Sequence, residues 1–195
     1  DYWFEYKHEI PKGYDNILKS LNDLNNHNIN IYYILGNHDY WDFGYFKKKF
    51  SAQFYRDDYR FSVNNQQVLV MHGDGFLISD SGYRLLKKIL RSKINIFLFK
   101  FLGATIGCKL AKLVSATTRH YDNQDNRNPE IISELTSWAE GKWKEGNDVI
   151  LVGHYHQIGI EEKNGKKLIF MGDWVTQFTV TVYDGKDWHQ YSWNT

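Results

Sequence analysis

The sequence predicts a mixed α/β fold in one globular domain. Short apolar strand-like runs alternate with amphipathic helical patterns, 42% of the 195 residues are hydrophobic, and no internal repeat or low-complexity linker interrupts the chain. A chain of this length and composition can bury a sizeable core. We therefore expect a single domain over residues 1–195, built on one or two mixed β-sheets.

The first half of the chain contains a helix pattern followed by strands. Residues 14–26 carry four apolar residues at helical spacing, Ile17, Leu18, Leu21 and Leu24. The apolar run 31–35 comes next and predicts a strand. Two further strand-like runs, 59–63 and 68–71, flank Asn64-Asn65 and predict a hairpin whose second arm ends at His72.

The second half continues the alternation. Asn128-Pro129 is suited to the cap and first turn of a helix, whose inner face comprises Ile131, Ile132, Leu135 and Trp138. Residues 149–152 form a short apolar strand. Three more strands are predicted with turns at Asn164-Gly165 and Asp184-Gly185, namely 168–171, 178–183 and 188–193.

Residues 84–115 depart from this alternation because basic and apolar side chains are mixed along them. The most apolar run, 94–106, is interrupted by Asn95, Lys100 and Gly103 and is shorter than the roughly 20 residues of a membrane span. We expect an inserted helical hairpin that lies on a membrane surface or encloses an apolar ligand. A helical pair that packs its apolar face on the core is the equal alternative.

Charge and cysteine content restrict the partners. The chain has 24 basic and 23 acidic residues, so no overall attraction to nucleic acid is expected. Cys108 is the single cysteine of the sequence, which excludes an internal disulfide and agrees with a reducing compartment.

Metal-binding residue types follow three predicted strands. Asn37, His72 and the pair His154 and His156 come directly after them, and imidazole and amide oxygen suit a first-row divalent metal. In an extended segment, His154 and His156 project to the same side while Tyr155 points away. The pair can offer two imidazoles to one metal or one each to two adjacent metals. The sequence thus predicts a metal site at one sheet edge.

The three strand ends also resemble a known family. GNHD at 36–39, HGD at 72–74 and GHYH at 153–156 are similar to three successive signatures of the calcineurin-like metallophosphoesterases. This resemblance implies a sandwich of two mixed β-sheets flanked by helices, with a two-metal centre, often of Mn²⁺, that activates water to attack phosphorus.

The resemblance also implies roles for individual residues. It assigns Asn37, His72 and His154 as ligands of one metal and His156 as a ligand of the other. His38 matches the position that contacts the phosphate or protonates the leaving group, and Asp39 its hydrogen-bonding partner. His38 and Asp39 are therefore the catalytic residues that the resemblance implies.

A narrower resemblance covers nearly the whole chain. HGDGFLISDSGYRLLKKILR from residue 72, the basic apolar segment and GDW at 172–174 are similar to the UDP-2,3-diacylglucosamine pyrophosphatases of the lipid A pathway. The resemblance implies hydrolysis of UDP-2,3-diacylglucosamine to lipid X and UMP at the cytoplasmic face of the inner membrane, with residues 84–115 as a cap over the acyl chains. Asp80 and Tyr83 match positions near the sugar and diphosphate and, with Asn37, His38 and His156, form the implied substrate-binding set.

The sequence departs from this family in two ways. His38 stands where the narrower family has Arg. No D-x-H or G-D-x-x-D motif, which would supply further ligands of the first metal and the bridging carboxylate, precedes residue 36, and Asp1 resembles the last Asp of the second motif. We expect an N-terminally truncated chain that binds Mn²⁺ weakly and hydrolyses little. His8 and Glu9 are poor substitutes because Pro11 and Gly13 indicate a loop.

Two alternatives remain open from the sequence. One is another phosphoesterase that cleaves a nucleotide or a simple phosphodiester, although such a substrate gives no reason for the apolar run 94–101. The other is a non-catalytic interaction module on the same scaffold, although such a module does not require His72, His154 and His156.

Overall fold

The computed structural model describes residues 3–6, 10–39, 41–99, 101, 106–107, 109 and 127–193. The chain divides into two compact units, one of Asp1–Arg56 with Gly82–Arg119 and one of Asp57–Ser81 with His120–Thr195. The predicted single domain therefore stays a prediction. Cys108, His8, Glu9 and part of the segment 84–115 lie outside the described residues.

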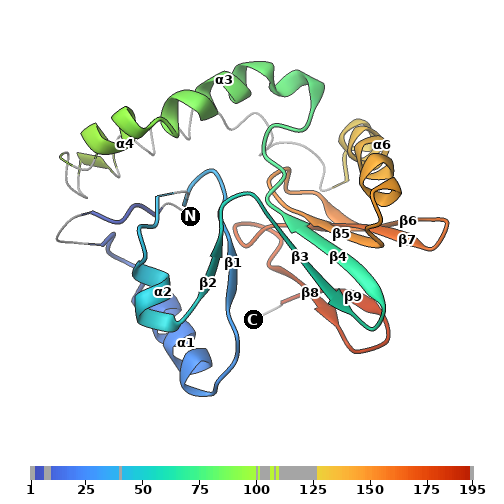
Figure 1. Cartoon of the computed structure of the whole chain (residues 1–195), viewed down its shortest axis with the longest axis horizontal. Helices are drawn as coiled ribbons and strands as arrows, with labels where there is room; N and C mark the ends of the chain where they lie inside the picture. Colours follow the sequence, from blue (N-terminus) through green and yellow to red (C-terminus); the bar gives the residue numbers. More distant parts are fainter. Residues whose placement is uncertain are drawn as a thin grey trace. The chain divides into compact units, whose positions relative to one another are not determined.

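The second unit is built on a five-stranded mixed sheet with the order β3-β4-β5-β7-β6 (Figure 1). Its strands are β3 (Asp58–Val63), β4 (Gln66–Met71), β5 (Val149–Val152), β6 (Ile158–Lys163) and β7 (Lys166–Met171). The central strands β4, β5 and β7 run parallel, while β3 and β6 are antiparallel edge strands. The predicted mixed α/β class is confirmed.

The register of the parallel strands aligns their carboxyl ends. Met71 of β4 pairs with Val152 of β5, and Val152 is level with Phe170 of β7. The chain therefore leaves β4, β5 and β7 at the same edge of the sheet, at His72, Gly153 and Gly172. Every side chain of β5 is buried, as expected for a strand covered on both faces.

Helix α6 (Pro129–Lys144) covers one face of the sheet, as Figure 1 shows. Its buried side chains pack with alternate residues of β4, β5 and β7, among them Leu69, Ile150 and Phe170. The predicted cap is confirmed, because the Asn128 side chain accepts hydrogen bonds from the N–H groups of Glu130 and Ile131.

The opposite face packs against a hairpin of β8 (Thr179–Tyr183) and β9 (Trp188–Ser192). Tyr183 and Trp188 of this hairpin contact the other set of alternating sheet residues, including Val149 and Ile169. This unit is thus a helix, a sheet and a hairpin in three layers, and the layers leave the carboxyl edge of the parallel strands to the loops.

The first unit contains α1 (Asp15–Asn26), β1 (Tyr32–Ile34), α2 (Tyr45–Phe50) and β2 (Gln53–Tyr55), and β1 pairs with β2 in parallel. Its core is aromatic: Trp3, Phe46 and Phe50 are buried together. The sequence analysis missed α2 and β2. Lys47, Lys48 and Lys49 give α2 a solvated face that hides its two buried Phe residues, and β2 is only 3 residues long.

The same unit holds the described part of the segment 84–115. Helices α3 (Ser81–Leu90) and α4 (Lys93–Phe99) contain no buried residue, and apolar side chains such as Leu85, Ile94 and Phe97 are 62%, 73% and 62% exposed. Phe99 of α4 nevertheless packs against the buried Phe4, with ring centroids 5.0 Å apart, so both expectations for this segment stay predictions. Among the described residues, no helix is both long and apolar enough to cross a membrane.

Candidate functional site

Two of the predicted metal ligands meet at the carboxyl edge of the sheet. His72 follows β4, His154 follows β5, and His154 Nδ1 lies 3.2 Å from His72 Nε2. Their rings are edge-to-face with centroids 4.9 Å apart. The parallel register therefore brings together two imidazoles that are 82 positions apart in the chain.

This spacing suits two nitrogen ligands of one metal. For metal–nitrogen bonds of 2.0–2.1 Å in tetrahedral geometry, the two nitrogens lie about 3.3 Å apart. The observed 3.2 Å also permits a hydrogen bond between the rings, for which one nitrogen must carry a proton. The distance is therefore compatible with either arrangement, and a metal bound to both nitrogens would require each ring to direct its lone pair away from the line that joins them.

The backbone at His154 is a tight turn rather than the expected extended segment. The Tyr155 N–H donates to the Gly153 carbonyl over 2.8 Å, which closes a three-residue γ-turn centred on His154. His154 and His156 both have left-handed backbones, with φ of +68° and +52°. Such turns with positive φ are rare and strained, and strained residues with a side chain concentrate at functional sites.

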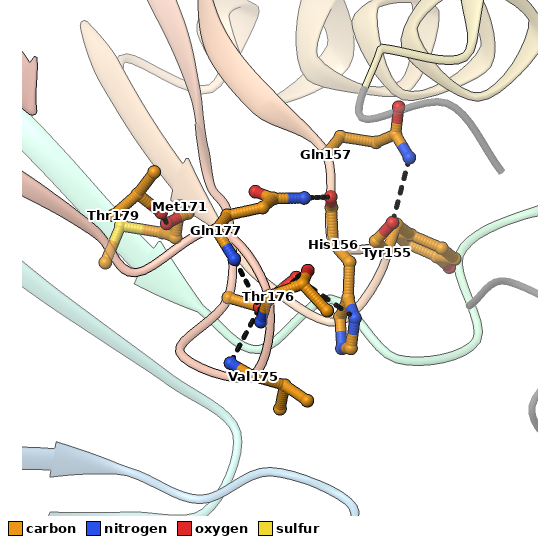
Figure 2. Close-up of polar contacts among 9 residues, drawn as sticks. Tyr155, His156, Gln157, Met171, Val175, Thr176, Gln177 and Thr179 are labelled. Carbon is orange, nitrogen blue, oxygen red and sulfur yellow. Dashed lines mark hydrogen bonds and ion pairs between the residues drawn. The ribbon is translucent and has the colours of Figure 1, made fainter. Parts of the chain in front are cut away.

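His156 takes a different partner from His154. Its Nδ1 lies 3.5 Å from Asp173 Oδ2, and its backbone carbonyl accepts a 2.6 Å hydrogen bond from the Gln177 side chain. Figure 2 shows His156 beside the loop that carries Val175, Thr176 and Gln177. The two histidines of GHYH therefore point to different neighbours, which favours the option that each serves its own metal.

Asp173 organises the loop that follows β7. One carboxylate oxygen accepts hydrogen bonds from the N–H groups of Val175, Thr176 and Gln177 at 2.7, 2.5 and 3.1 Å. Burial raises the pKa of Asp173, but these backbone donors outweigh it and the pKa is lower than usual. The Asp173 carboxylate thus accepts hydrogen bonds from the backbone of the loop that follows β7 and also faces the ring of His156.

The GNHD motif lies in the first unit, after β1. Asp39 accepts hydrogen bonds from the Tyr33 hydroxyl at 2.6 Å and from the Gly36 N–H at 2.5 Å. Burial and then the Asp39 charge raise the pKa of Tyr33, so its hydroxyl stays protonated as the donor. Asp39 thereby fixes the loop that carries Asn37 and His38, and the roles of all three stay predictions.

The two predicted sugar and diphosphate contacts differ in exposure. Asp80 is 3% exposed and accepts a 2.7 Å hydrogen bond from the Tyr155 hydroxyl, whereas Tyr83 is half-buried on α3. Within the described ranges, no group of three or more His, Cys, Asp and Glu residues converges on one metal position. The predicted ligand set combines Asn37 with histidines of the other unit, so it stays a prediction.

Sequence reasoning missed Tyr155 and Gln177 as parts of this site. Tyr155 was expected only to point away, but its ring is fully buried and its hydroxyl is hydrogen-bonded. A tyrosine directly between two strand-end histidines was a usable signal, because a buried hydroxyl requires a partner. Gln177 carried no comparable signal, since its contact with His156 depends on the course of the loop.

The left-handed backbone of His156 gives a direct prediction. His156→Gly is expected to be more stable than His156→Ala by about 1 kcal/mol, because a residue with Cβ pays about 1–2 kcal/mol in this conformation. Urea unfolding followed by circular dichroism measures the difference. At the exposed Ser137 of α6, the order is expected to reverse, with Gly about 0.5–1 kcal/mol below Ala. The same order at both positions contradicts a left-handed His156.

Comparisons with known proteins agree with the sequence resemblance. No protein-family model matches the chain. The chain is 23% identical over 201 residues to the UDP-2,3-diacylglucosamine hydrolase of Porphyromonas gingivalis, an alignment that covers 95% of this chain and 77% of that protein. Enzymes of the same name from Ectopseudomonas mendocina and Stutzerimonas stutzeri are 27% and 26% identical, covering 95% and 90% of this chain and 75% of each relative.

Two solved structures are also similar, at 14% identity and a TM-score of 0.40 each. One is an archaeal phosphodiesterase, for which the match covers 89% of this chain and 75% of the other, and one is vacuolar protein sorting 29 from Cryptosporidium parvum, with 95% and 90% covered. The predicted resemblance to the UDP-2,3-diacylglucosamine enzymes is confirmed by the sequence alignments, which cover most of the chain.

Proposed function

We propose that this chain, a homologue of the UDP-2,3-diacylglucosamine hydrolases, is a metal-dependent hydrolase that cleaves the diphosphate of UDP-2,3-diacylglucosamine into lipid X and UMP. The observation that carries the proposal is the imidazole pair His72 and His154, whose nitrogens lie 3.2 Å apart where β4 and β5 end. A diphosphate is an anion that needs charge neutralisation, and such a pair can hold the cation that supplies it.

The proposed site uses two divalent metals, Mn²⁺ as the candidate, with Asn37, His72 and His154 for one and His156 for the other. When bound, the metals would lower the pKa of a water molecule and would neutralise charge on the phosphoryl oxygens. Asp173, below its usual pKa, stays ionised at neutral pH and orients His156. His38 in its protonated form would donate a proton to the leaving oxygen and become neutral imidazole, while Asp39 holds its loop.

The helices α3 and α4 support a lipid-linked substrate. Their exposed apolar residues alternate with basic ones, among them Arg84, Lys87 and Lys88, which is the composition of a surface that meets acyl chains and anionic lipid headgroups. We propose that they hold the acyl chains of the substrate at the cytoplasmic face of the inner membrane. A nucleotide or a simple phosphodiester offers nothing for the exposed apolar side chains of these helices to bind.

The proposal is tested by incubating the purified chain with UDP-2,3-diacylglucosamine and Mn²⁺ and measuring UMP and the lipid product by mass spectrometry. We expect release of both, because the chain aligns with UDP-2,3-diacylglucosamine hydrolases over most of its length. Release is expected to stop with a metal chelator. Faster cleavage of a nucleotide or of bis-p-nitrophenyl phosphate would instead support the other phosphoesterase, and no cleavage of any of these would support the interaction module.

A further inference from the structure

Tyr155 stands between the two histidines of GHYH and is wholly buried. Its ring is edge-to-face with His154 at a centroid distance of 4.8 Å. Its hydroxyl donates to Asp80 Oδ2 over 2.7 Å and accepts from the N–H groups of Phe76 and Leu77 at 2.8 and 3.2 Å. One donor and two acceptor positions are all that a hydroxyl has, so every one is used.

These bonds join the two loops that carry the imidazole pair. Phe76 and Leu77 lie in the loop that begins at His72, and Tyr155 directly follows His154. The loops also meet closer to the strands, where the Gly153 N–H donates to the His72 carbonyl over 3.1 Å. The separation of the two imidazoles is therefore bounded by one backbone bond on the strand side and by the Tyr155 hydroxyl on the far side.

Tyr155 is itself held from α6. Gln157 donates from its side chain to the Tyr155 carbonyl over 3.0 Å, and its side-chain oxygen accepts from the N–H of Asn128 over 2.6 Å. Gln157 is 3% exposed, so this connection runs through the interior of the unit. The Tyr155 hydroxyl thus connects the His72 loop to residues 155–157, which Gln157 fixes to Asn128 at the start of α6.

A packing role alone does not explain a hydroxyl at this position. Phenylalanine would fill the same volume, whereas tyrosine brings a polar group that must be satisfied inside the protein. The Tyr155 hydroxyl is hydrogen-bonded by residues of the loop that follows His72, whereas Tyr155 itself lies in the loop that contains His154. Asp80 completes the connection, because the same Oδ2 also accepts from the Leu77 N–H over 3.3 Å.

We propose that Tyr155, through its hydroxyl and Asp80, is a positioning residue that fixes the separation of the His72 and His154 imidazoles. The inference rests on the proposed function, in which this pair holds a metal. It gives Asp80 a role in aligning metal ligands, in addition to the substrate contact that the family resemblance implies.

The test is Tyr155→Phe, which keeps the ring and removes the three hydrogen bonds that join the two loops. We expect Mn²⁺ affinity, measured by calorimetry on fully folded protein, to fall about 10–100-fold, as for other groups that orient metal ligands. Asp80→Ala is expected to behave similarly, and the double variant no worse than the weaker single one, because both break the same connection. Losses that simply add would contradict the proposed connection.

Two controls separate positioning from general destabilisation. Ile131→Val removes a methylene from the same buried cluster and leaves the hydrogen bonds between the two loops in place, and Tyr183→Phe removes a hydroxyl from β8. Both are expected to retain the wild-type Mn²⁺ affinity. If Ile131→Val weakens Mn²⁺ binding as much as Tyr155→Phe does, the effect is one of stability and the inference is wrong.

A second readout distinguishes failure of the inference from failure of the proposed function. In metal-free protein, Tyr155→Phe is expected to shift the imidazole ¹⁵N resonances of His72 and His154 and to leave those of His189 on β9 unchanged. Wild-type protein that binds no Mn²⁺ refutes the metal site, and the resonances then decide the positioning role alone. Wild-type affinity with unshifted resonances in Tyr155→Phe overturns the inference while the function stands.

Discussion

Replacing His154 with alanine is expected to lower the affinity of the chain for Mn²⁺ by more than about 100-fold, a larger loss than that caused by changing residues that only orient ligands. His154 Nδ1 is one of two nitrogens that converge at 3.2 Å, and a single remaining imidazole binds a divalent cation weakly. Calorimetric titration of the variant with Mn²⁺ measures the loss. Release of UMP is expected to become undetectable.

The matched control is His189→Ala, which removes an imidazole that pairs with Asp184 at 3.0 Å on the hairpin of β8 and β9. Its Mn²⁺ affinity is expected to equal that of the wild type. His72→Ala is expected to lose as much as His154→Ala, and the double variant little more, because both nitrogens serve one ion. Independent, additive losses would show that the two imidazoles do not share a metal.

Replacing Gly73 with alanine is expected to destabilise the chain by about 2–5 kcal/mol, the sum of two effects. The backbone at Gly73 has φ of +94°, a conformation that destabilises a residue with Cβ by about 1–2 kcal/mol. A Cβ would also stand 2.4 Å from Val152 Cγ2, and overpacking of this kind costs about 1–3 kcal/mol. Because Val152 ends β5 and Gly73 follows His72, relief of the clash moves the two loops apart.

Gly165→Ala carries only the first effect, so the difference between the two variants isolates the second. Gly165 also has a left-handed backbone, with φ of +74°, but a Cβ there meets nothing within 4 Å. It is therefore expected to lose only about 1–2 kcal/mol, and its Mn²⁺ affinity is expected to stay that of the wild type. Urea unfolding of both variants gives the comparison. Equal stability losses at Gly73 and Gly165 would mean that β5 accommodates the added methyl group without any loss of stability.

The sequence predicted those parts of the fold that depend on local patterns. Strand 149–152 is apolar throughout because both of its faces are covered, and Asn128-Pro129 marks the start of α6 because cap and first turn have distinct chemistry. The meeting of His72 and His154 could be predicted as well, since parallel strands end at one edge. Edge strand β6 (Ile158–Lys163) was not predicted, so these patterns account for most of the second unit and not for all of its sheet.

Features that depend on tertiary context escaped prediction. The left-handed backbone of His154 and His156 is enforced by surrounding bonds against the preference of the residue, so an extended segment was expected instead. Helix α2 escaped because its six residues are too few to show a period, and its buried Phe46 and Phe50 gain their core only from distant aromatic residues such as Trp3.

In the mixed sheet, the histidine loops and two of the hairpin turns lie at opposite ends of the strands. Its turns at Asn64-Asn65 and Asn164-Gly165 close hairpins at the ends of β4 and β7 opposite to His72 and Asp173. Lengthening such a turn costs only about 0.6 kcal/mol for each doubling of the loop. The Asn164-Gly165 turn is consequently the place to insert an affinity tag or a fluorescent reporter, so that binding can be followed on a molecule whose histidine loops are unchanged.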